Sequence, residues 1–372
     1  MSSGALPSPN RPVPAAPDQA APPDPARVEV VAPHFKRRLS GVTSTLLQLV
    51  PLQARQLGVA TLGPGLPPSF PRLRWWQLPA LWRRPPSRPF RIWHARRNIE
   101  MLAGIGLCHL LRAPLRLVFT SAAQRHHRRF TRWMIRRMDA VIATNPRSGS
   151  FLQVPHTVIR HGVDLRRFHP PEVPGFDPAA AGLPGRFLIG CFGRIRPQKG
   201  TDLFVEAMLD LLPQHPDWTA ILTGRVTSEH RPFADSLVNR IAGAGLTDRI
   251  RFLGEVPEVA SWYRRLSLYV APSRNEGFGL TPLEAMASGV PVVASDAGAY
   301  ADQIVPGATG AVVPPGDAKA LREAIRPYLA DPALAGLHGR QALKHVATHF
   351  DLVLEAEALR AVYEQLWNSG HA

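Results

Sequence analysis

Two glutamates, Glu276 and Glu284, stand with seven residues between them in a segment that also holds the turn Gly277-Phe278-Gly279. A carboxylate accepts paired hydrogen bonds from neighbouring hydroxyls, and glycine lets a backbone come close to a ligand. Two carboxylates at this spacing therefore suit a ligand that carries two diols, such as a sugar and a ribose.

The elements around these glutamates predict where such a ligand would bind. Residues 266–271 form an apolar run that predicts a buried strand, and Thr281 with Pro282 suits the N-cap and first position of a helix. The order is then strand, glycine loop and helix, which is where open α/β sheets bind ligands. Amides at the start of that helix can hold an anion.

Two further segments carry candidate chemistry. Residues 190–200 read Gly-Cys-Phe-Gly-Arg-Ile-Arg-Pro-Gln-Lys-Gly, and residues 158–170 read Val-Ile-Arg-His-Gly-Val-Asp-Leu-Arg-Arg-Phe-His-Pro. Each alone is often only a solvated loop. Together with Glu276 and Glu284, in this order, they resemble the retaining glycosyltransferases of family 4 (glycosyltransferase group 1). This resemblance implies the GT-B fold, two facing Rossmann-like domains with a donor cleft between them.

The resemblance also implies a role for each residue. Arg194 and Lys199 would face the donor diphosphate and neutralise charge on the leaving group. Glu276, with the backbone of residues 277–279, would orient the sugar hydroxyls, and Glu284 would hold the ribose. Further donor-binding positions would be Gly41, Leu280 and Thr281. The base would lie near residues 225–230 and 254–256.

The resembled class retains anomeric configuration, by front-face attack with the leaving phosphate as the base toward the acceptor. No Asp-x-Asp metal element is evident in a loop. We therefore expect a nucleotide-sugar donor, no cofactor and no obligatory metal ion.

Two positions in the first half depart from the family pattern. The loop that usually holds two adjacent glycines has Ser40-Gly41, so Gly41 is either a phosphate-binding or a mere turn residue. Many relatives carry a histidine after the strand that here ends at Thr120, where this chain has Ser121-Ala122-Ala123. His94 is the candidate acceptor or sugar contact, and a structural role is its alternative.

Charge is the second informative property. The formal net charge is +16, and residues 72–137 hold sixteen arginines against one acid, Glu100. Five of the eight tryptophans lie in the same stretch. Arginine with tryptophan suits an anionic membrane surface. A solvated surface and a nucleic-acid surface are the alternatives, and we expect no nucleic-acid partner.

Residues 88–101, 119–125 and 138–144 narrow the resemblance to bacterial lipopolysaccharide core mannosyltransferases. This implies transfer of mannose from GDP-mannose to an inner-core Kdo, a lipid-linked saccharide acceptor, by a cytoplasmic protein peripheral on the inner face of the cytoplasmic membrane. Two alternatives stay open. One is another nucleotide sugar of the UDP-glucose type with a different lipid-linked acceptor, and the other is a non-catalytic basic scaffold that binds anionic lipid.

The length allows two domains, each with its own core. We expect a disordered proline-rich tail at 1–26, an N-terminal Rossmann-like acceptor domain at 27–170 and a C-terminal nucleotide-sugar domain at 187–350. A last helix at 351–372 would pack back on the first domain. Strands alternating with helices from residue 187 predict a parallel doubly wound sheet.

Cys108 and Cys191 stand far apart in apolar contexts, which favours reduced, buried thiols. The N-terminus has no basic segment followed by an apolar run, so we expect no signal peptide. Residues 101–119 are apolar but are interrupted by charge and proline, so they are not expected to span a bilayer.

Overall fold

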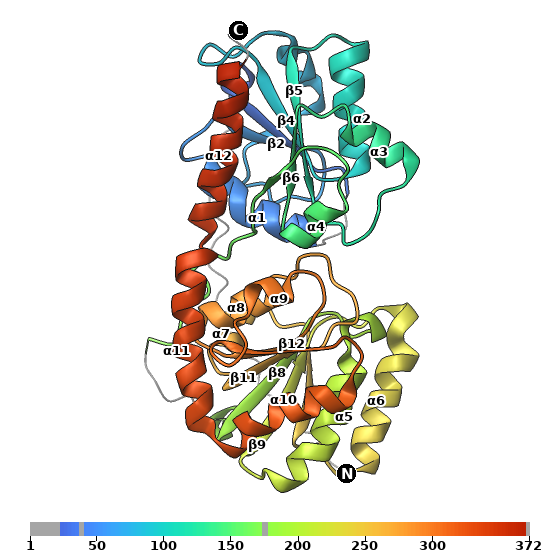
Figure 1. Cartoon of the computed structure of the whole chain (residues 1–372), viewed down its shortest axis with the longest axis vertical. Coiled ribbons are helices and arrows are strands. Elements are labelled where there is room, and N and C mark those ends of the chain that lie inside the picture. Colours follow the sequence, from blue (N-terminus) through green and yellow to red (C-terminus); the bar gives the residue numbers. More distant parts are fainter. Residues whose placement is uncertain (1–22, 37–40, 173–177, 370–372) are drawn as a thin grey trace.

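The computed structural model describes residues 23–36, 41–172 and 178–369. Two parallel β-sheets, each flanked by helices, face one another along the long axis of the molecule (Figure 1). The expected pair of facing Rossmann-like domains is therefore confirmed, as is the alternation of strands and helices after residue 187.

The first sheet has seven strands in the order β3-β2-β1-β4-β5-β6-β7, and every pair is parallel. Its central strands β1 and β4 are buried throughout because helices cover both faces of a parallel sheet. The strands are β1 (Val30–Pro33), β2 (Val59–Leu62), β3 (Arg72–Leu73), β4 (Arg91–Ala95), β5 (Leu115–Ser121), β6 (Ala140–Ala143) and β7 (Thr157–Val158).

The second sheet has six parallel strands in the order β10-β9-β8-β11-β12-β13. The strand order reverses between β8 and β11, and such a switch point is where doubly wound sheets bind ligands, outside the carboxyl ends of the strands. The strands are β8 (Phe187–Phe192), β9 (Trp218–Thr223), β10 (Ile250–Gly254), β11 (Leu268–Ala271), β12 (Val292–Ser295) and β13 (Gly310–Val313).

Twelve α-helices lie within the described residues, and most cover the two sheets (Figure 1). Those of the first half are α1 (Gly41–Gln53), α2 (Asn98–Ile105), α3 (Arg129–Ile135) and α4 (Pro146–Ser150). Those of the second half are α5 (Thr201–Leu211), α6 (Arg231–Gly243), α7 (Val259–Tyr263), α8 (Thr281–Ala287), α9 (Tyr300–Gln303), α10 (Ala318–Ala330), α11 (Pro332–His349) and α12 (Leu352–Ser369).

Helix α11 was not predicted from the sequence, because glycines at 336 and 339 lower its helix propensity. A Cβ on Gly339 would lie 2.1 Å from the carbonyl oxygen of Gly289, just after α8. The glycine that weakens the helical signal is therefore what allows α11 to pack closely on the second domain.

The last helix, α12, leaves the second domain and lies along the first (Figure 1). Leu359, Tyr363 and Trp367 are buried in one cluster with Leu46 of α1 and Ile92 of β4. The indole of Trp367 also donates a hydrogen bond to the carbonyl oxygen of Phe90 at 3.0 Å. The end of the chain thus completes the core of the domain in which it began.

Three details correct the expectations. Pro25–Arg27 form a short 3-10 helix whose carbonyls accept hydrogen bonds from Arg91, so the tail boundary expected at residue 26 is too late. The N-cap of α8 is Leu280, not Thr281, which is its first residue. Trp93, one of the five tryptophans of the stretch 72–137, is buried in the core and does not belong to the expected membrane surface.

Residues 1–22 of the expected tail, Ser40 of the Ser40-Gly41 loop, and 173–177 of the region between the two sheets lie outside the described residues. Within the part of the chain that the structure describes, no helix is long and apolar enough to cross a membrane.

Candidate active site

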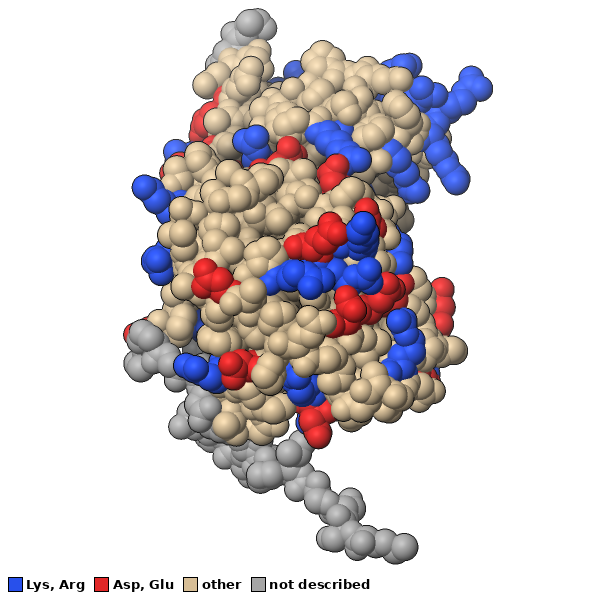
Figure 2. All heavy atoms as spheres, turned by 60° about the horizontal axis from the view of Figure 1, so that its bottom comes forward, with Lys and Arg blue, Asp and Glu red and all other residues tan. Residues whose placement is uncertain are grey.

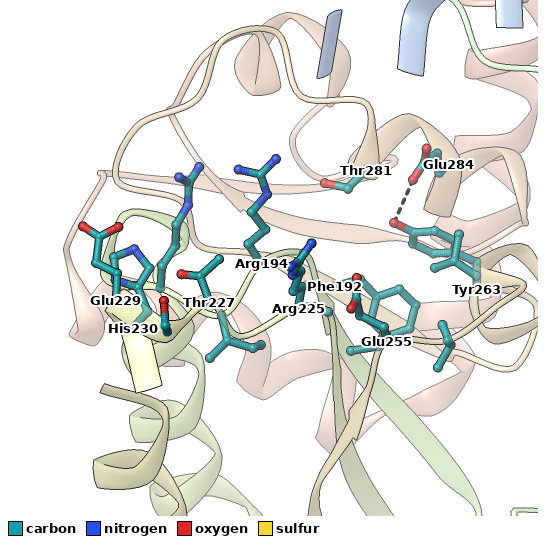
Figure 3. A pocket seen from close by; sticks show the side chains of 18 residues that line it. Phe192, Arg194, Arg225, Thr227, Glu229, His230, Glu255, Tyr263, Thr281 and Glu284 are labelled. Atoms are coloured by element: carbon teal, nitrogen blue, oxygen red, sulfur yellow. Dashed lines mark hydrogen bonds between the residues drawn. The ribbon is translucent and has the colours of Figure 1, made fainter. Parts of the chain in front are cut away.

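A cavity of about 780 Å³ opens at the carboxyl edge of the second sheet, where the strand order reverses (Figure 3). Loops after β8 and β9, the end of β10 and helices α7 and α8 supply its walls. The lining residues are Phe192, Gly193, Arg194, Ile195, Arg196, Thr223, Gly224, Arg225, Thr227, Ser228, Glu229, His230, Glu255, Val256, Val259, Tyr263, Thr281 and Glu284.

Lys199 and Glu276 form an ion pair next to this cavity, and each side chain is about one-fifth exposed. The hydroxyl of Tyr300 donates to the same carboxylate oxygen of Glu276 at 3.4 Å. Burial disfavours the charged ammonium, but the neighbouring Tyr300 and Glu276 outweigh it, so the pKa of Lys199 is raised. Lys199 is therefore a permanent cation at neutral pH, and Glu276 is held by two partners.

The loop after Glu276 needs a glycine at position 279. Gly279 has φ of +83°, and a Cβ there would lie 2.3 Å from the ring of Tyr300. Its carbonyl oxygen accepts a hydrogen bond from the amide of Gln303 at 2.9 Å, and Phe278 between the two glycines is buried. The turn seen in the sequence is thus a tightly packed loop pressed against α9.

Glu284 lies on α8, and its Oε2 accepts a hydrogen bond from the hydroxyl of Tyr263 at 3.0 Å (Figure 3). Burial raises the pKa of Glu284, while the Tyr263 hydroxyl and the charges of Arg167 and Lys199 oppose that rise. One oxygen of the carboxylate is thereby engaged, and Glu284 still faces the cavity.

A small hollow adjoins the cavity, and Arg194 and Thr281 line both. Lys199 and Tyr300 line the hollow on its other side. Two cationic side chains, Arg194 and Lys199, therefore line the hollow, and Glu276, which lines neither space, is paired with Lys199. Two such cations can stabilise negative charge that builds up on a phosphate as its bond to carbon breaks.

The far end of the cavity is built from the residues expected near a base. Arg225, Thr227, Ser228, Glu229 and His230 of the loop after β9, with Glu255 and Val256 after β10, all line it. Figure 3 shows Glu229 and His230 on the side away from Glu284. The cavity thus offers polar side chains at both ends and positive charge between them.

Other candidate residues do not line this cavity. Gly277, Phe278, Gly279 and Leu280 lie in the loop behind Lys199, and Gly41 begins α1 in the first domain. His94 is buried on β4, with Nδ1 bonded to the Tyr363 hydroxyl at 2.6 Å and Nε2 to Thr120 at 2.7 Å. Both ring nitrogens are engaged within the protein, which favours the structural alternative, and the sugar contact of His94 stays a prediction.

Three side chains of the site were missed from the sequence: Tyr263, Tyr300 and Arg196. The two tyrosines sit on the short helices α7 and α9, and nothing in their local pattern marks them. Arg196 could have been found, because it lies between Arg194 and Lys199 in the same loop.

Within residues 23–36, 41–172 and 178–369, no three His, Cys, Asp or Glu side chains gather in a way that could hold a metal ion. The expected independence from metal therefore stays a prediction. Cys108 and Cys191 are free thiols.

This chain is similar to known proteins over most of its length. The model of glycosyl transferases group 1 matches residues 177–345. The lipopolysaccharide core biosynthesis mannosyltransferase LpcC of Rhizobium leguminosarum bv. viciae is 65% identical over 345 residues, covering 92% of this chain and 98% of that protein. Its counterpart LpsB of Rhizobium meliloti (strain 1021) is 53% identical, covering 91% of this chain and 98% of that protein.

Among solved structures, sucrose-phosphate synthase from Thermosynechococcus elongatus superposes with a TM-score of 0.75 at 22% identity, covering 92% of this chain and all of that one. At this identity the likeness supports the GT-B fold alone. Identity as high as 65% over nearly the whole of a relative decides the family. The chain therefore belongs to the glycosyl transferases of group 1 and is a glycosyltransferase.

Proposed function

We propose that this chain transfers mannose from GDP-mannose to an inner-core Kdo of lipopolysaccharide, with retention of anomeric configuration. The observation that carries the proposal is the 65% identity to a lipopolysaccharide core biosynthesis mannosyltransferase, which spans both domains and not only the second. Acceptor specificity is expected to reside in the first domain, so likeness that extends through it supports a shared acceptor.

The cavity suits a nucleoside diphosphate sugar. Its volume and polar ends would accept the base near Arg225 to His230 and the ribose at Glu284, with the diphosphate beside Arg194 and Lys199. The sugar would then reach Glu276, which its partners Lys199 and Tyr300 hold in place.

In the proposed reaction, the bond between the anomeric carbon and the diphosphate oxygen breaks first. The acceptor hydroxyl attacks the same face and forms the new glycosidic bond, and its proton passes to the leaving phosphate. Arg194 and Lys199 stabilise the charge that the diphosphate gains, and Glu276 orients the sugar hydroxyls. The chain would supply these groups with no obligatory metal ion.

We also propose that the protein binds the cytoplasmic face of an anionic membrane through its first domain. Trp75 and Trp76 are 57% and 68% exposed, and Leu110 is 80% exposed beside a hollow of about 280 Å³ whose lining is apolar. Lys and Arg side chains gather at the upper right of Figure 2, with few acidic neighbours. Indole and guanidinium suit the interface of such a membrane.

The arginine count overstates this basic surface, however. Arg91 is buried, Arg88 pairs with Glu29 and Glu364, and Arg116 pairs with Asp139. Exposed arginines remain along the stretch at 72, 74, 83, 84, 112, 125, 128, 129, 136 and 137.

The donor and acceptor are tested together with purified protein. GDP-mannose, UDP-glucose, UDP-GlcNAc and ADP-heptose are each supplied with and without a Kdo-lipid acceptor, and nucleotide release and product are measured. We expect GDP release and a mannosylated lipid only when GDP-mannose and the acceptor are both present. Turnover with a different donor and none with GDP-mannose would overturn the mannose assignment. Lipid binding without turnover of any donor would favour the scaffold alternative.

Membrane binding is tested by sedimentation with vesicles of anionic or zwitterionic lipid. Trp75→Ala with Trp76→Ala is expected to reduce binding to the anionic vesicles, while Leu337→Ala, which removes an exposed apolar side chain of the second domain, leaves it unchanged. Equal binding by all three proteins would contradict this contact.

A further inference from the structure

The segment that leads out of the first domain is bonded to the start of the last helix. The amide of Val163 donates to the carbonyl oxygen of Phe350 at 2.8 Å, and the amide of Leu352 donates to the carbonyl oxygen of Val163 at 3.1 Å. A Cβ on Gly162 would lie 2.5 Å from the Cα of Leu352. The two crossings between the domains are therefore packed backbone against backbone.

Glu355, in the first turn of α12, adds a side chain to this junction. The residue is buried, and its Oε2 accepts a hydrogen bond from the amide of Gly162 at 2.8 Å. Its Oε1 lies 2.7 Å from Nδ1 of His161, which is also buried. A carboxylate only accepts, so this contact places the proton on Nδ1 and holds the imidazole in one orientation.

The imidazole of His161 in turn meets the loop of the active site. Its ring lies edge-on to the ring of Phe278, with centroids 4.8 Å apart and planes at 79°, a favourable aromatic arrangement. Phe278 stands between two glycines, so it supplies the side-chain contact of this turn, beside the backbone bonds that its carbonyl accepts from Ala299 and that of Gly279 accepts from Gln303. Glu276, which pairs with Lys199, is two residues earlier.

We infer that His161, oriented by Glu355, is a positioning residue that holds the Gly277-Phe278-Gly279 loop, and with it Glu276, in the geometry needed for sugar transfer. The inference rests on the proposed function for its effect on turnover. His161 does not line the cavity or the hollow, so it acts through Phe278 and not on the substrate directly.

The same path ties the loop to the first domain. From Glu355, α12 continues to Tyr363, whose hydroxyl bonds to His94 on β4. The loop that carries Glu276 is thus held by two sets of contacts, those of Lys199 and Tyr300 within the second domain and that of His161 at the crossing between the domains. Glu284 is held separately by Tyr263 of α7, and the residues near Arg225 lie in the loop after β9, so we expect nucleotide binding not to depend on His161.

The test uses three variants, His161→Ala, Glu355→Ala and the double variant that carries both changes. The control is Glu357→Ala, which removes an exposed carboxylate two residues further along α12. Each single variant is expected to lower kcat by roughly 10- to 100-fold, because a misplacement of about 1 Å can cost about 100-fold. The Kd for GDP should be unchanged. The double variant should be no slower than the singles, because both changes remove one path.

Three results would overturn the inference: a kcat equal to that of Glu357→Ala, losses that multiply in the double variant, or a Kd for GDP that rises as kcat falls. Hydrogen exchange of the amides at 276–281 tests the positioning role of His161 separately from the proposed function. If the unaltered protein turns over no nucleotide sugar, the proposed function fails. Faster exchange in His161→Ala than in Glu357→Ala still supports the positioning, and equal exchange overturns it.

Discussion

The hydroxyl of Tyr263 on α7 lies 3.0 Å from Oε2 of Glu284 on α8, and both side chains face the cavity at the switch point of the second sheet. The contact draws the carboxylate of Glu284 toward its ionised form against the effect of burial. The tyrosine therefore tunes the residue that would hold the ribose.

Tyr263→Phe is expected to shift the pH dependence of donor binding. Burial already raises the pKa of Glu284, and losing the hydroxyl raises it further. A protonated Glu284 accepts hydrogen bonds less well, so the KM for donor should rise as the pH falls, beginning at a higher pH in the variant. Profiles of kcat/KM from about pH 5 to pH 9 measure this. Tyr328→Phe, whose hydroxyl bonds to His338 elsewhere in the domain, is the control and should not shift the profile.

Glu276→Ala should reduce kcat by roughly 10²- to 10³-fold, the range found when one transition-state contact is removed. The reason is that Glu276 is the carboxylate held by Lys199 and Tyr300 beside the hollow. Circular dichroism and the midpoint of thermal unfolding check that the fold is retained. Unchanged kcat in a folded variant would refute the role of Glu276 in orienting the sugar.

Arg194→Ala should lower kcat/KM by a comparable factor of roughly 10² because it removes one of the two cations proposed to flank the donor diphosphate. Arg194 lines both the cavity and the adjoining hollow. Arg240→Ala on the exposed face of α6 is the matched control, since it removes the same charge away from the cavity. A normal Kd for GDP together with a normal rate in Arg194→Ala would exclude the diphosphate role.

Tyr363→Phe should destabilise the protein by about 1–3 kcal/mol, because it leaves Nδ1 of His94 buried without its partner. Urea unfolding measures the free energy of unfolding. A loss no larger than that of an exposed substitution such as Arg360→Ala would show that this hydrogen bond contributes nothing.

The same histidine predicts a pH dependence of stability. Burial, with the charge of Arg96, holds the pKa of His94 well below its ordinary 6.5. Below pH 6.5 the unfolded chain binds a proton that the folded chain does not, so His94 makes stability fall as the pH falls through that value. His94→Gln should weaken this part of the acid dependence, measured as unfolding free energy against pH.

Arg147 of α4 reaches Asp296, after β12, across the two domains at 3.0 Å. Both side chains are about half exposed, so the pair is screened by solvent. Arg147→Ala should change the free energy of unfolding by less than about 1 kcal/mol. A larger loss, or coupling above that value in a double-mutant cycle with Asp296→Ala, would show that this contact holds the domains together.

Much of the fold follows from local pattern. The strands of the second sheet are mostly apolar, and their order with the helices predicts a parallel doubly wound sheet. The short strand β13 and the glycine-containing α11 were missed, because their residues favour those elements only through contacts with distant segments.

The candidate site also combines residues that the sequence indicated with contacts that only the fold creates. Glu276 and Glu284 could be named from their spacing, while Arg194, Lys199 and the two loops at the far end of the cavity were expected from the family resemblance. His94 could be placed on a strand from the sequence, yet its burial against Tyr363 depends on a helix that lies far along the chain.

The sequence by itself determined the family, the two sheets and the charged residues of the site, because these depend on residue types and local spacing. Only the tertiary structure decided which of those residues meet. Lys199 and Glu276 are 77 positions apart and pair because β8 and β11 are neighbours in the sheet. His161 reaches Phe278, and Glu355 reaches His161, only because the chain crosses twice between the domains at one point.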